Sequence, residues 1–460
     1  MKMELFETQA DATALPIWPV ATGAVEGWCN EHAGANAAWV GTAGFSGEAG
    51  RVLLLPDNAG GLAGALLGIG KNTDPFIYAA LSETLPEGTY RFAGLEPEAA
   101  RHATLAWALG AYRFDKYKSA ERSLPRLVVP EGVDESEIES LAGAITLTRD
   151  LVNIPAGDFG PAELEAAARN ISDRFGASFS VIAGDQLLTE NYPMIHAVGR
   201  AAGVGAEPRL LDFTWGEASD PKVTLVGKGV CFDTGGLNLK PGNSMGLMKK
   251  DMGGAAHVLA LAQLIMEAGL KVRLRVLIPA VENAVAGNAF RPGDVLQSRK
   301  GLTVEIGNTD AEGRLILADA LAEADGEAPE LLIDMATLTG AARVALGPDL
   351  PPFYTDDDVF ADALGEICER EADPLWRMPL WQPYDEWLKS KIADINHISD
   401  GGHAGSITAA LFLNRFVENA QTHVHFDVFA WNPRARVGRP VGGEAQGIRA
   451  LFALLKKKYA

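Results

Sequence analysis

The sequence predicts an α/β protein with a smaller N-terminal α/β domain, residues 1–150, and a larger α/β domain, residues 151–460. The first observation is length: the chain has 460 residues, and at roughly 150 residues per domain two or three domains are expected. The second is that, after residue 150, apolar runs typical of buried strands alternate with helix-like segments. Such alternation predicts a mixed, mostly parallel central sheet with helices on both faces.

The N-terminal domain is predicted from short apolar runs separated by turn signals. Residues 51–55 and 66–69 predict strands, residues 127–129 are a further apolar run, and residues 98–112 have apolar side chains at helical spacing. Residues 133–151 predict a helix that bridges the two domains. A stretch with proline and glycine follows, and Pro161 is expected in the first turn of the next helix, with Asp158 or Gly160 as its cap.

In the larger domain the predicted elements alternate in type. The expected strands are residues 223–227, 272–281, 302–306, 331–335 and 423–429. The expected helices are residues 251–268, 315–324, 407–417 and 446–457. Ligands of such sheets bind beyond the carboxyl ends of the strands, so functional side chains are expected just after strands.

Composition and charge exclude several classes of protein. With 47% hydrophobic and 22% charged residues, the chain is neither disordered nor collagen-like. Its net charge of −20 repels nucleic acid and anionic lipid, so we expect neither as a partner. The three cysteines include no CxxC pair, and neither a secretory signal nor a membrane-spanning apolar stretch is recognisable. We therefore expect a cytoplasmic protein.

Carboxylates are concentrated after two of the predicted strands. Asp233 and Asp251 follow the strand at 223–227, and Asp310 and Glu312 follow the strand at 302–306. Carboxylate oxygens are ligands of divalent cations, and several are needed to offset the charge of two ions. If the two strands are adjacent, and if residues 310–314 are extended, these side chains can meet at one site that contains no histidine.

Each of these pieces taken alone has an ordinary explanation. An Asp-x-Glu is most often a solvated turn, and Asp251 can serve simply as a helix cap. Lys228, Lys240 and Arg314 could each be surface side chains. The hypothesis depends on all of them occurring together at strand ends.

The ordered motifs resemble the leucine aminopeptidase family, the cytosolic dizinc exopeptidases. The string NTDAEGRL at 308–315 is that family's hallmark, and VGKG, FDTGG, LKP and MKKDMGGAA precede it in the same order. DLVNIP at 150–155, MATLTGAARVALG at 335–347 and AGSITAAL at 404–411 extend the match. Residues 1–150 match only loosely, through LGIGK at 67–71 and YRFDKYK at 112–118.

The resemblance implies two divalent metal ions per subunit, zinc or manganese. Asp233 and Glu312 would bridge the two ions, Lys228 and Asp251 would complete the tightly held one, and Asp310 the exchangeable one. A lysine ligand must be neutral, which requires its pKa to fall far below the usual value of about 10.4.

The resemblance also implies catalytic and substrate-binding residues. Lys240 would polarise the scissile carbonyl, and Arg314 would hold a bicarbonate ion that acts as the general base. The residues expected to bind substrate are Met248, Asn308, Thr337, Leu338 and Gly340.

The implied function is a metal-dependent aminopeptidase of broad specificity that acts on peptides with a free N-terminal amine, as a homo-hexamer. The C-terminal string GGEAQGIRAL departs from the family's commoner form, so a leucine preference is not implied. Two alternatives remain open. Another dimetal hydrolase, such as a phosphatase, could use Lys228 and Arg314 for phosphate. A DNA-binding or scaffold role is opposed by the net charge of −20.

His423 and His425 could suggest a further metal site, because residues two apart on a strand share a face. No carboxylate or cysteine accompanies them in the sequence. We therefore expect an ordinary packed pair on a strand.

Overall fold

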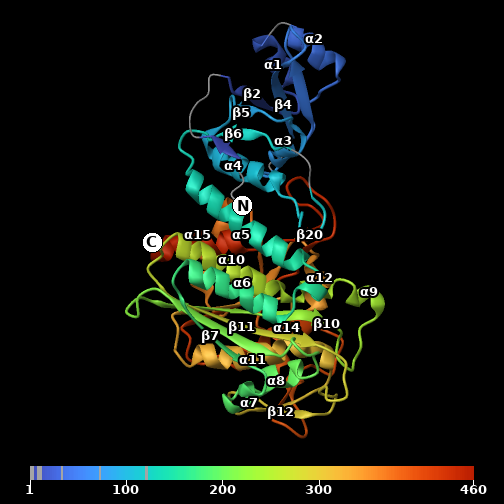
Figure 1. The fold of residues 1–460 in the computed structure, drawn as a ribbon, viewed down its shortest axis with the longest axis vertical. Coiled ribbons are helices and arrows are strands. Elements are labelled where there is room, and N and C mark those ends of the chain that lie inside the picture. Colours follow the sequence, from blue (N-terminus) through green and yellow to red (C-terminus); the bar gives the residue numbers. More distant parts are fainter. Residues whose placement is uncertain (1–4, 8–12, 33–34, 72–73, 120–122) are drawn as a thin grey trace. The chain divides into compact units, whose positions relative to one another are not determined.

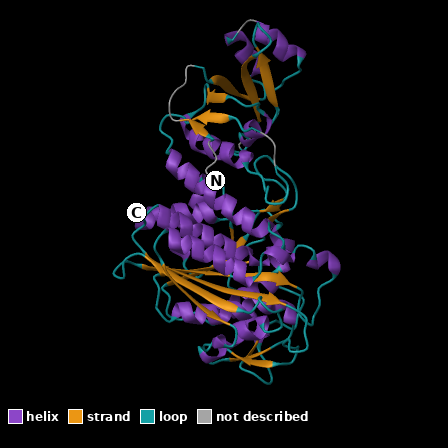
Figure 2. Cartoon of the chain, in the orientation of Figure 1, coloured by secondary structure: helices purple, strands orange, loops and turns teal. Residues whose placement is uncertain are grey.

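The computed structural model describes residues 5–7, 13–32, 35–71, 74–119 and 123–460. It divides the chain into two compact units: Met1–Thr146 with Arg434–Val441, and Leu147–Pro433 with Gly442–Ala460. The division falls within helix α5 (Glu135–Asn153), which passes from the first unit into the second. Figures 1 and 2 show helices and strands in both units, which confirms the predicted two-domain α/β class.

The N-terminal unit is built on a six-stranded sheet. The strands are β1 (Phe6–Glu7), β2 (Leu15–Ala21), β3 (Val52–Pro56), β4 (Leu62–Gly70), β5 (Thr89–Phe92) and β6 (Arg126–Val128). Their order is β1-β6-β5-β2-β4-β3, and only β3 runs antiparallel to its neighbour. The helices are α1 (Val25–Glu31), α2 (Ala35–Thr42), α3 (Ala79–Thr84) and α4 (Pro97–Ala111).

The second unit contains a nine-stranded sheet. Its strands are β7 (Ser178–Ala183), β8 (Arg209–Trp215), β9 (Lys222–Gly227), β10 (Gly229–Asp233), β11 (Arg273–Asn283), β14 (Leu331–Ala336), β15 (Pro352–Tyr354), β16 (Trp376–Arg377) and β18 (Thr422–Asp427). The order is β16-β15-β18-β14-β9-β11-β8-β7, with β10 also paired to β11. The central strands β18, β14, β9 and β11 are parallel. β15 is antiparallel to β18 and parallel to β16, whereas β8 is antiparallel to β11 and β7 is antiparallel to β8.

Helices cover both faces of this sheet (Figure 1). One face carries α6 (Pro161–Arg174), α10 (Gly253–Glu267) and α15 (Ile448–Tyr459), and the other carries α8 (Pro193–Gly199), α11 (Glu312–Asp325) and α14 (Gly405–Asn414). The remaining helices are α7 (Gln186–Thr189), α9 (Gly242–Met245), α12 (Gly340–Leu346) and α13 (Asp358–Arg370). Gly160 is the N-cap residue of α6, and its N–H donates to Glu163 Oε2 at 2.9 Å.

Helix α10 packs directly against β9 and β14, for a reason visible in its sequence. It is apolar around its circumference and buried from Gly253 to Met266. A Cβ added at Gly254 would lie 2.0 Å from the carbonyl oxygen of Met335 on β14. The paired glycines therefore allow the helix backbone to touch the strand backbone.

Two local expectations are wrong. The strand predicted at 302–306 is present as β13 (Thr303–Glu305), but it belongs to a separate sheet with β12 (Val295–Gln297) and β17 (Ile395–Asn396). It is therefore not adjacent to β9 or β10. Residues 310–314 are not extended, because a 3-10 turn, η3 (Thr309–Ala311), leads directly into α11.

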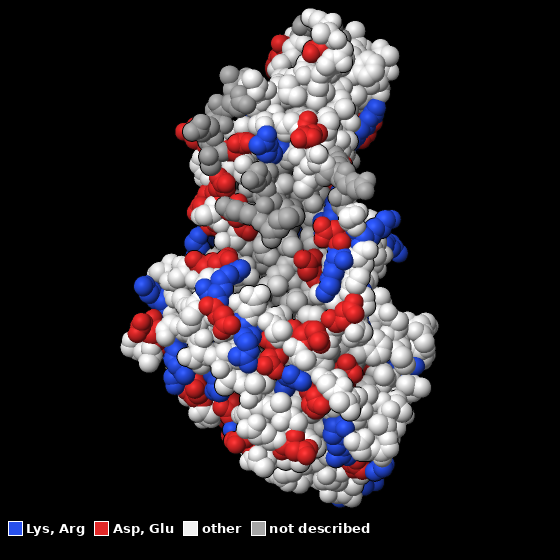
Figure 3. Space-filling view, viewed as in Figure 1, with Lys and Arg blue, Asp and Glu red and all other residues white. Residues whose placement is uncertain are grey.

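Charged side chains of both signs are interspersed over the second unit on the face shown in Figure 3. Among the described residues, no helix is long and apolar enough to cross a membrane.

Candidate metal centre

A cavity of about 500 Å³ lies beyond the carboxyl ends of β10, β14 and β18. It is lined by eleven of the twelve residues that the sequence singled out. These are Lys228, Asp233, Lys240, Met248, Asp251, Asp310, Glu312, Arg314, Thr337, Leu338 and Gly340. The structure thus brings together side chains from five separate segments of the second unit.

Three carboxylates form the centre of this site. One oxygen each of Asp233, Asp310 and Glu312 lie within 4.8 Å of one another, an arrangement able to hold a metal ion. Asp233 is the last residue of β10, and Glu312 is the first residue of α11. Asp233 and Glu312 are 2% and 1% exposed, so their charges require compensation by a cation.

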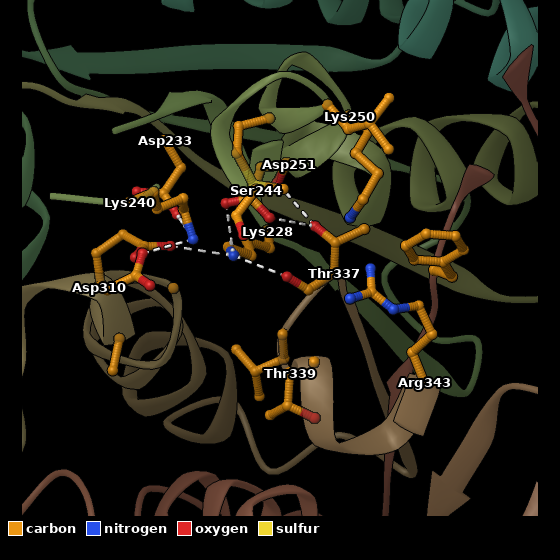
Figure 4. A pocket seen from close by; sticks show the side chains of 18 of the residues that line it. Lys228, Asp233, Lys240, Ser244, Lys250, Asp251, Asp310, Thr337, Thr339 and Arg343 are labelled. Carbon is orange, nitrogen blue, oxygen red and sulfur yellow. Dashed lines mark hydrogen bonds and ion pairs between the residues drawn. The ribbon is translucent and has the colours of Figure 1, made fainter. Parts of the chain in front are cut away.

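Two lysines supply positive charge among these acids (Figure 4). Lys228 Nζ lies 2.7 Å from Asp251 Oδ2 and 3.1 Å from Glu312 Oε1. Lys240 Nζ lies 2.9 Å from Asp233 Oδ2 and 2.5 Å from Asp310 Oδ1. The ammonium groups therefore occupy positions between carboxylates, where a cation is electrostatically favoured.

The donor set fits divalent metal ions. Asp251 Oδ2 and Asp310 Oδ1 are buried and accept no hydrogen bond of good geometry from any described residue, although a lysine lies near each. Glu312 belongs both to the group around Lys228 and to the three-carboxylate group, as a bridging ligand would. Hard oxygen donors in this number suit Mn²⁺ and Zn²⁺.

The two acid-bearing loops meet through hydrogen bonds rather than through adjacent strands. Asn283 Nδ2, at the end of β11, donates to Asp233 Oδ1 at 2.8 Å and to Thr309 O at 3.0 Å. Thr309 Oγ1 donates to Gly235 O at 2.6 Å and accepts from Asn238 N at 2.8 Å. Gly235 has φ +85°, which a side chain would disfavour.

Sequence reasoning missed Asn283. Its signal was its place at the carboxyl end of a buried strand, close to where the other functional residues lie.

Burial and mutual repulsion shift the pKa values of the acids. Burial, reinforced by the charge of Asp251, raises the pKa of Asp233. Burial, reinforced by Asp233, raises the pKa of Glu312. Burial opposes the charge on Lys228, but Asp251, Glu312 and Asp233 together raise its pKa. Burial and like charge thus oppose the ionised form of Asp233 and Glu312 when no cation is nearby.

Helix α11 holds Lys228 in place through a glycine. A Cβ added at Gly313 would lie 2.3 Å from Lys228 Cε, so only glycine allows the lysine to pass the first turn of the helix. Lys228 Nζ also donates to Thr337 O at 2.8 Å. Its position is therefore set by three separate elements.

Arg314 has a buried guanidinium group, and not all of its N–H donors are used by described residues. Its NH1 donates to His397 O at 2.7 Å, whereas its Nε has no hydrogen-bond partner among the described residues. Burial lowers the pKa of Arg314 to about 10, which leaves it charged at neutral pH. A buried charged donor that faces the cavity can hold a small anion, and the bicarbonate suggested by the sequence fits this chemistry.

Four of the five residues expected to bind substrate line the cavity, and Asn308 does not. Asn308 Oδ1 instead accepts from Asp310 N at 2.8 Å, and its carbonyl lies 2.9 Å from His397 Nε2. Asn308 therefore orients the Asp310 turn, and its contact with substrate stays a prediction.

A carboxylate from a distant part of the sequence accompanies His423 and His425 in the fold. Asp334 Oδ2 lies 2.9 Å from His423 Nε2, and Asp334 Oδ1 lies 2.6 Å from His425 Nδ1. Asp334 is on β14, which pairs with β18 and places it beside His425. The three side chains form a buried group within the sheet. Their partner comes from a distant part of the chain, which the local pattern does not reveal.

Comparisons with known proteins agree with the motifs. Residues 146–452 match the profile described as the cytosol aminopeptidase family, catalytic domain, and residues 15–130 match the M17 aminopeptidase N-terminal domain. The crystal structure of a cytosol aminopeptidase from Coxiella burnetii is 45% identical, with a TM-score of 0.95 over 100% of both chains.

Two more distant relatives show the same similarity. The bottromycin maturation enzyme BotP in complex with Mn is 33% identical, with a TM-score of 0.87 over 97% of this chain and 100% of that one. A Peptidase B from Pectobacterium atrosepticum is 40% identical over 332 residues, which cover 70% of this chain and 76% of the relative.

Proposed function

This chain belongs to the cytosol aminopeptidase family, and from that premise we propose that it removes N-terminal residues from peptides with broad specificity, using two divalent metal ions, Zn²⁺ or Mn²⁺. Membership of the family establishes the general activity, which is that of an aminopeptidase. The observation that carries the proposal is the carboxylate group of Asp233, Asp310 and Glu312, within 4.8 Å of one another, beside the buried pair of Lys228 and Asp251.

The chain's own residues would hold the two ions as follows. Lys228, in its deprotonated form, and Asp251 would bind one, Asp310 the other, and Asp233 and Glu312 both. When bound, the ions would act as Lewis acids and would lower the pKa of a bound water molecule. The bicarbonate would act as the general base. The occurrence of Mn in the BotP structure supports a metal of this class.

Lys240 would bind the carbonyl oxygen of the scissile bond. Burial opposes its charge, but Asp233 and Asp310 raise its pKa, so the ammonium form persists at neutral pH. With these acids engaged as metal ligands, Lys240 Nζ would be free to donate to the substrate. Such a donor stabilises the negative charge that develops on the oxygen.

Arg314 would position the bicarbonate beside the attacked carbonyl. Its Nε is buried without a partner, whereas its NH1 is fixed by the backbone at His397. One donor thus sets the direction of the guanidinium and others remain for the anion.

A requirement for a free N-terminal amine, a homo-hexameric assembly and a cytoplasmic location belong to the same proposal. All three follow from the family resemblance, and the amine requirement also agrees with a cavity rich in metal ligands.

The proposal is tested by assaying chelator-treated protein with Zn²⁺ or Mn²⁺ added back. We expect hydrolysis of aminoacyl amides, no hydrolysis of the same amides with an acetylated amine, and no activity on phosphate monoesters. Phosphatase activity without amide hydrolysis would show the site to be that of another dimetal hydrolase. A mobility-shift assay at low salt addresses the DNA-binding alternative.

Replacement of Arg314 by Ala tests the assignment of the anion. We expect kcat to fall by about 10²–10⁴, the range for general acid–base assistance, while bound metal stays near two equivalents. Metal content by elemental analysis separates loss of the anion from loss of the metals. Full activity of this variant would remove the proposed role.

A further inference from the structure

The cavity contains a cation that neither the fold nor the metal centre uses. Lys250 is 5% exposed and lines the cavity between Met248 and Asp251 of the 3-10 turn η2 (Met248–Met252). No described carboxylate lies within 4.0 Å of its Nζ, and its ammonium makes no hydrogen bond to any described group. Its Nζ lies over the face of Phe429, at 4.9 Å from the ring centroid.

A second cation shares that aromatic ring. Arg343, on α12, places its guanidinium 4.9 Å from the centroid of Phe429, and it too has no ion pair with a described residue. Figure 4 shows the ends of Lys250 and Arg343 directed toward each other. Two like charges that share one ring repel each other, unless an anion lies between them.

The nearest acids are already engaged. Asp251 pairs with Lys228 and accepts from Thr337 Oγ1 at 2.8 Å. Asp427 accepts from the backbone N–H groups of Leu338 and Thr339 at 3.0 and 3.1 Å. The charges of Asp251 and Asp427 favour the ammonium form of Lys250 from a distance, but neither carboxylate forms an ion pair with Lys250 or Arg343.

The pair lies where a substrate side chain would extend. Lys250 and Arg343 line the same cavity as Met248 and Gly340, the residues expected around the first side chain of the substrate. Lys240 and Asp310, which belong to the metal centre, lie at the other side of the view in Figure 4. A peptide held at the metal centre would thus direct its first side chain toward the cationic pair.

We propose that Lys250 and Arg343 bind the side-chain carboxylate of the substrate's N-terminal residue, so that peptides beginning with glutamate or aspartate are preferred. This inference rests on the proposed aminopeptidase function. A guanidinium and an ammonium in a partly desolvated pocket bind a carboxylate strongly, and Phe429 contacts the methylene groups of the side chain. A glutamine side chain has the same shape but no charge, so it would bind the two cations much more weakly.

The test compares glutamyl and glutaminyl substrates on the metal-loaded enzyme. We expect kcat/KM for a glutamyl amide to exceed that of the glutaminyl amide by about tenfold or more, as expected for a charge-assisted hydrogen bond. A ratio near one, with good hydrolysis of leucyl amide, would overturn this inference alone. Absence of hydrolysis with every aminoacyl amide would instead overturn the proposed function.

Variants assign the preference to the pair. Arg343→Gln, at an exposed position, and Lys250→Gln should each reduce the Glu/Gln ratio, and the double variant should bring it near one. Lys250→Arg, which keeps the charge, should retain a ratio above one. The matched control is Lys271→Gln, which removes an exposed charge beyond the far end of α10 and should leave the ratio unchanged. If the double variant keeps the wild-type ratio, the assignment is wrong.

Discussion

His257, on α10, is a fully buried histidine with both ring nitrogens engaged. Its Nε2 lies 2.9 Å from Gln446 N, and its Nδ1 lies 2.6 Å from Gly253 O. A backbone N–H can only donate, so Nε2 accepts and Nδ1 carries the proton. Protonation of Nε2 would break this bond, and burial lowers the pKa of His257 to about 4.

This histidine should make the protein less stable at acidic pH. An unfolded histidine has a pKa of about 6.5. Between pH 6.5 and 4 the unfolded chain therefore binds a proton that the folded chain does not, and stability falls as pH falls. At pH 5 the loss from this group is about 2 kcal/mol relative to pH 7.5.

Urea unfolding of chelator-treated protein at the two pH values measures the effect. His257→Gln should be less stable than wild type at pH 7.5, but it should lose about 2 kcal/mol less on acidification. Because other groups titrate equally in both proteins, the difference isolates His257. Equal losses in wild type and variant would contradict the neutral assignment.

Among the elements, the central strands are predictable because their signal is local. β9 and β14 are buried on both faces and therefore read as continuous apolar runs. β13 lies in the stretch LTVEI at 302–306, where apolar and polar residues alternate, and its existence is predicted correctly. That β13 belongs to a separate sheet is not predicted, because the sequence of one strand does not specify which other strand pairs with it.

The candidate site shows the same division between local and distant information. Asp310 and Glu312 are recognisable because they lie in one motif with their glycine. Asn283 is not, since an asparagine after a strand is a common turn residue. Lys250 and Arg343 come from different elements, and only the fold brings both to Phe429.

For the whole molecule, the acids of the metal centre link metal binding to stability. Asp233, Asp251, Asp310 and Glu312 meet only in the folded chain, and burial raises the pKa of all but Asp251, whose pKa is held down by Lys228. A ligand that binds only the folded state stabilises it by about 2.7 kcal/mol at a hundred times its Kd. Metal ions should therefore raise the midpoint of thermal unfolding of the chelator-treated protein.

Replacing each carboxylate by its uncharged amide should distinguish the acids that bind both ions from those that bind one. Glu312→Gln and Asp233→Asn remove ligands shared by both ions, so they should lower bound metal well below two equivalents and abolish most of the rise in midpoint. Asp251→Asn should lose mainly one equivalent, because Asp251 pairs with Lys228 and is not part of the three-carboxylate group. Glu217→Gln, at an exposed position, is the matched control and should keep both ions.

Elemental analysis of dialysed protein and calorimetry with added Mn²⁺ or Zn²⁺ give the two readouts independently of activity. One equivalent of metal in fully active wild-type enzyme would contradict the two-ion centre. Retention of both ions by Glu312→Gln would show that this glutamate does not bridge them, even though its Oε1 lies 3.1 Å from Lys228 Nζ. A parallel loss of metal and of the metal-induced stabilisation in both bridging variants is the expected result, because each removes a charge on which both ions depend.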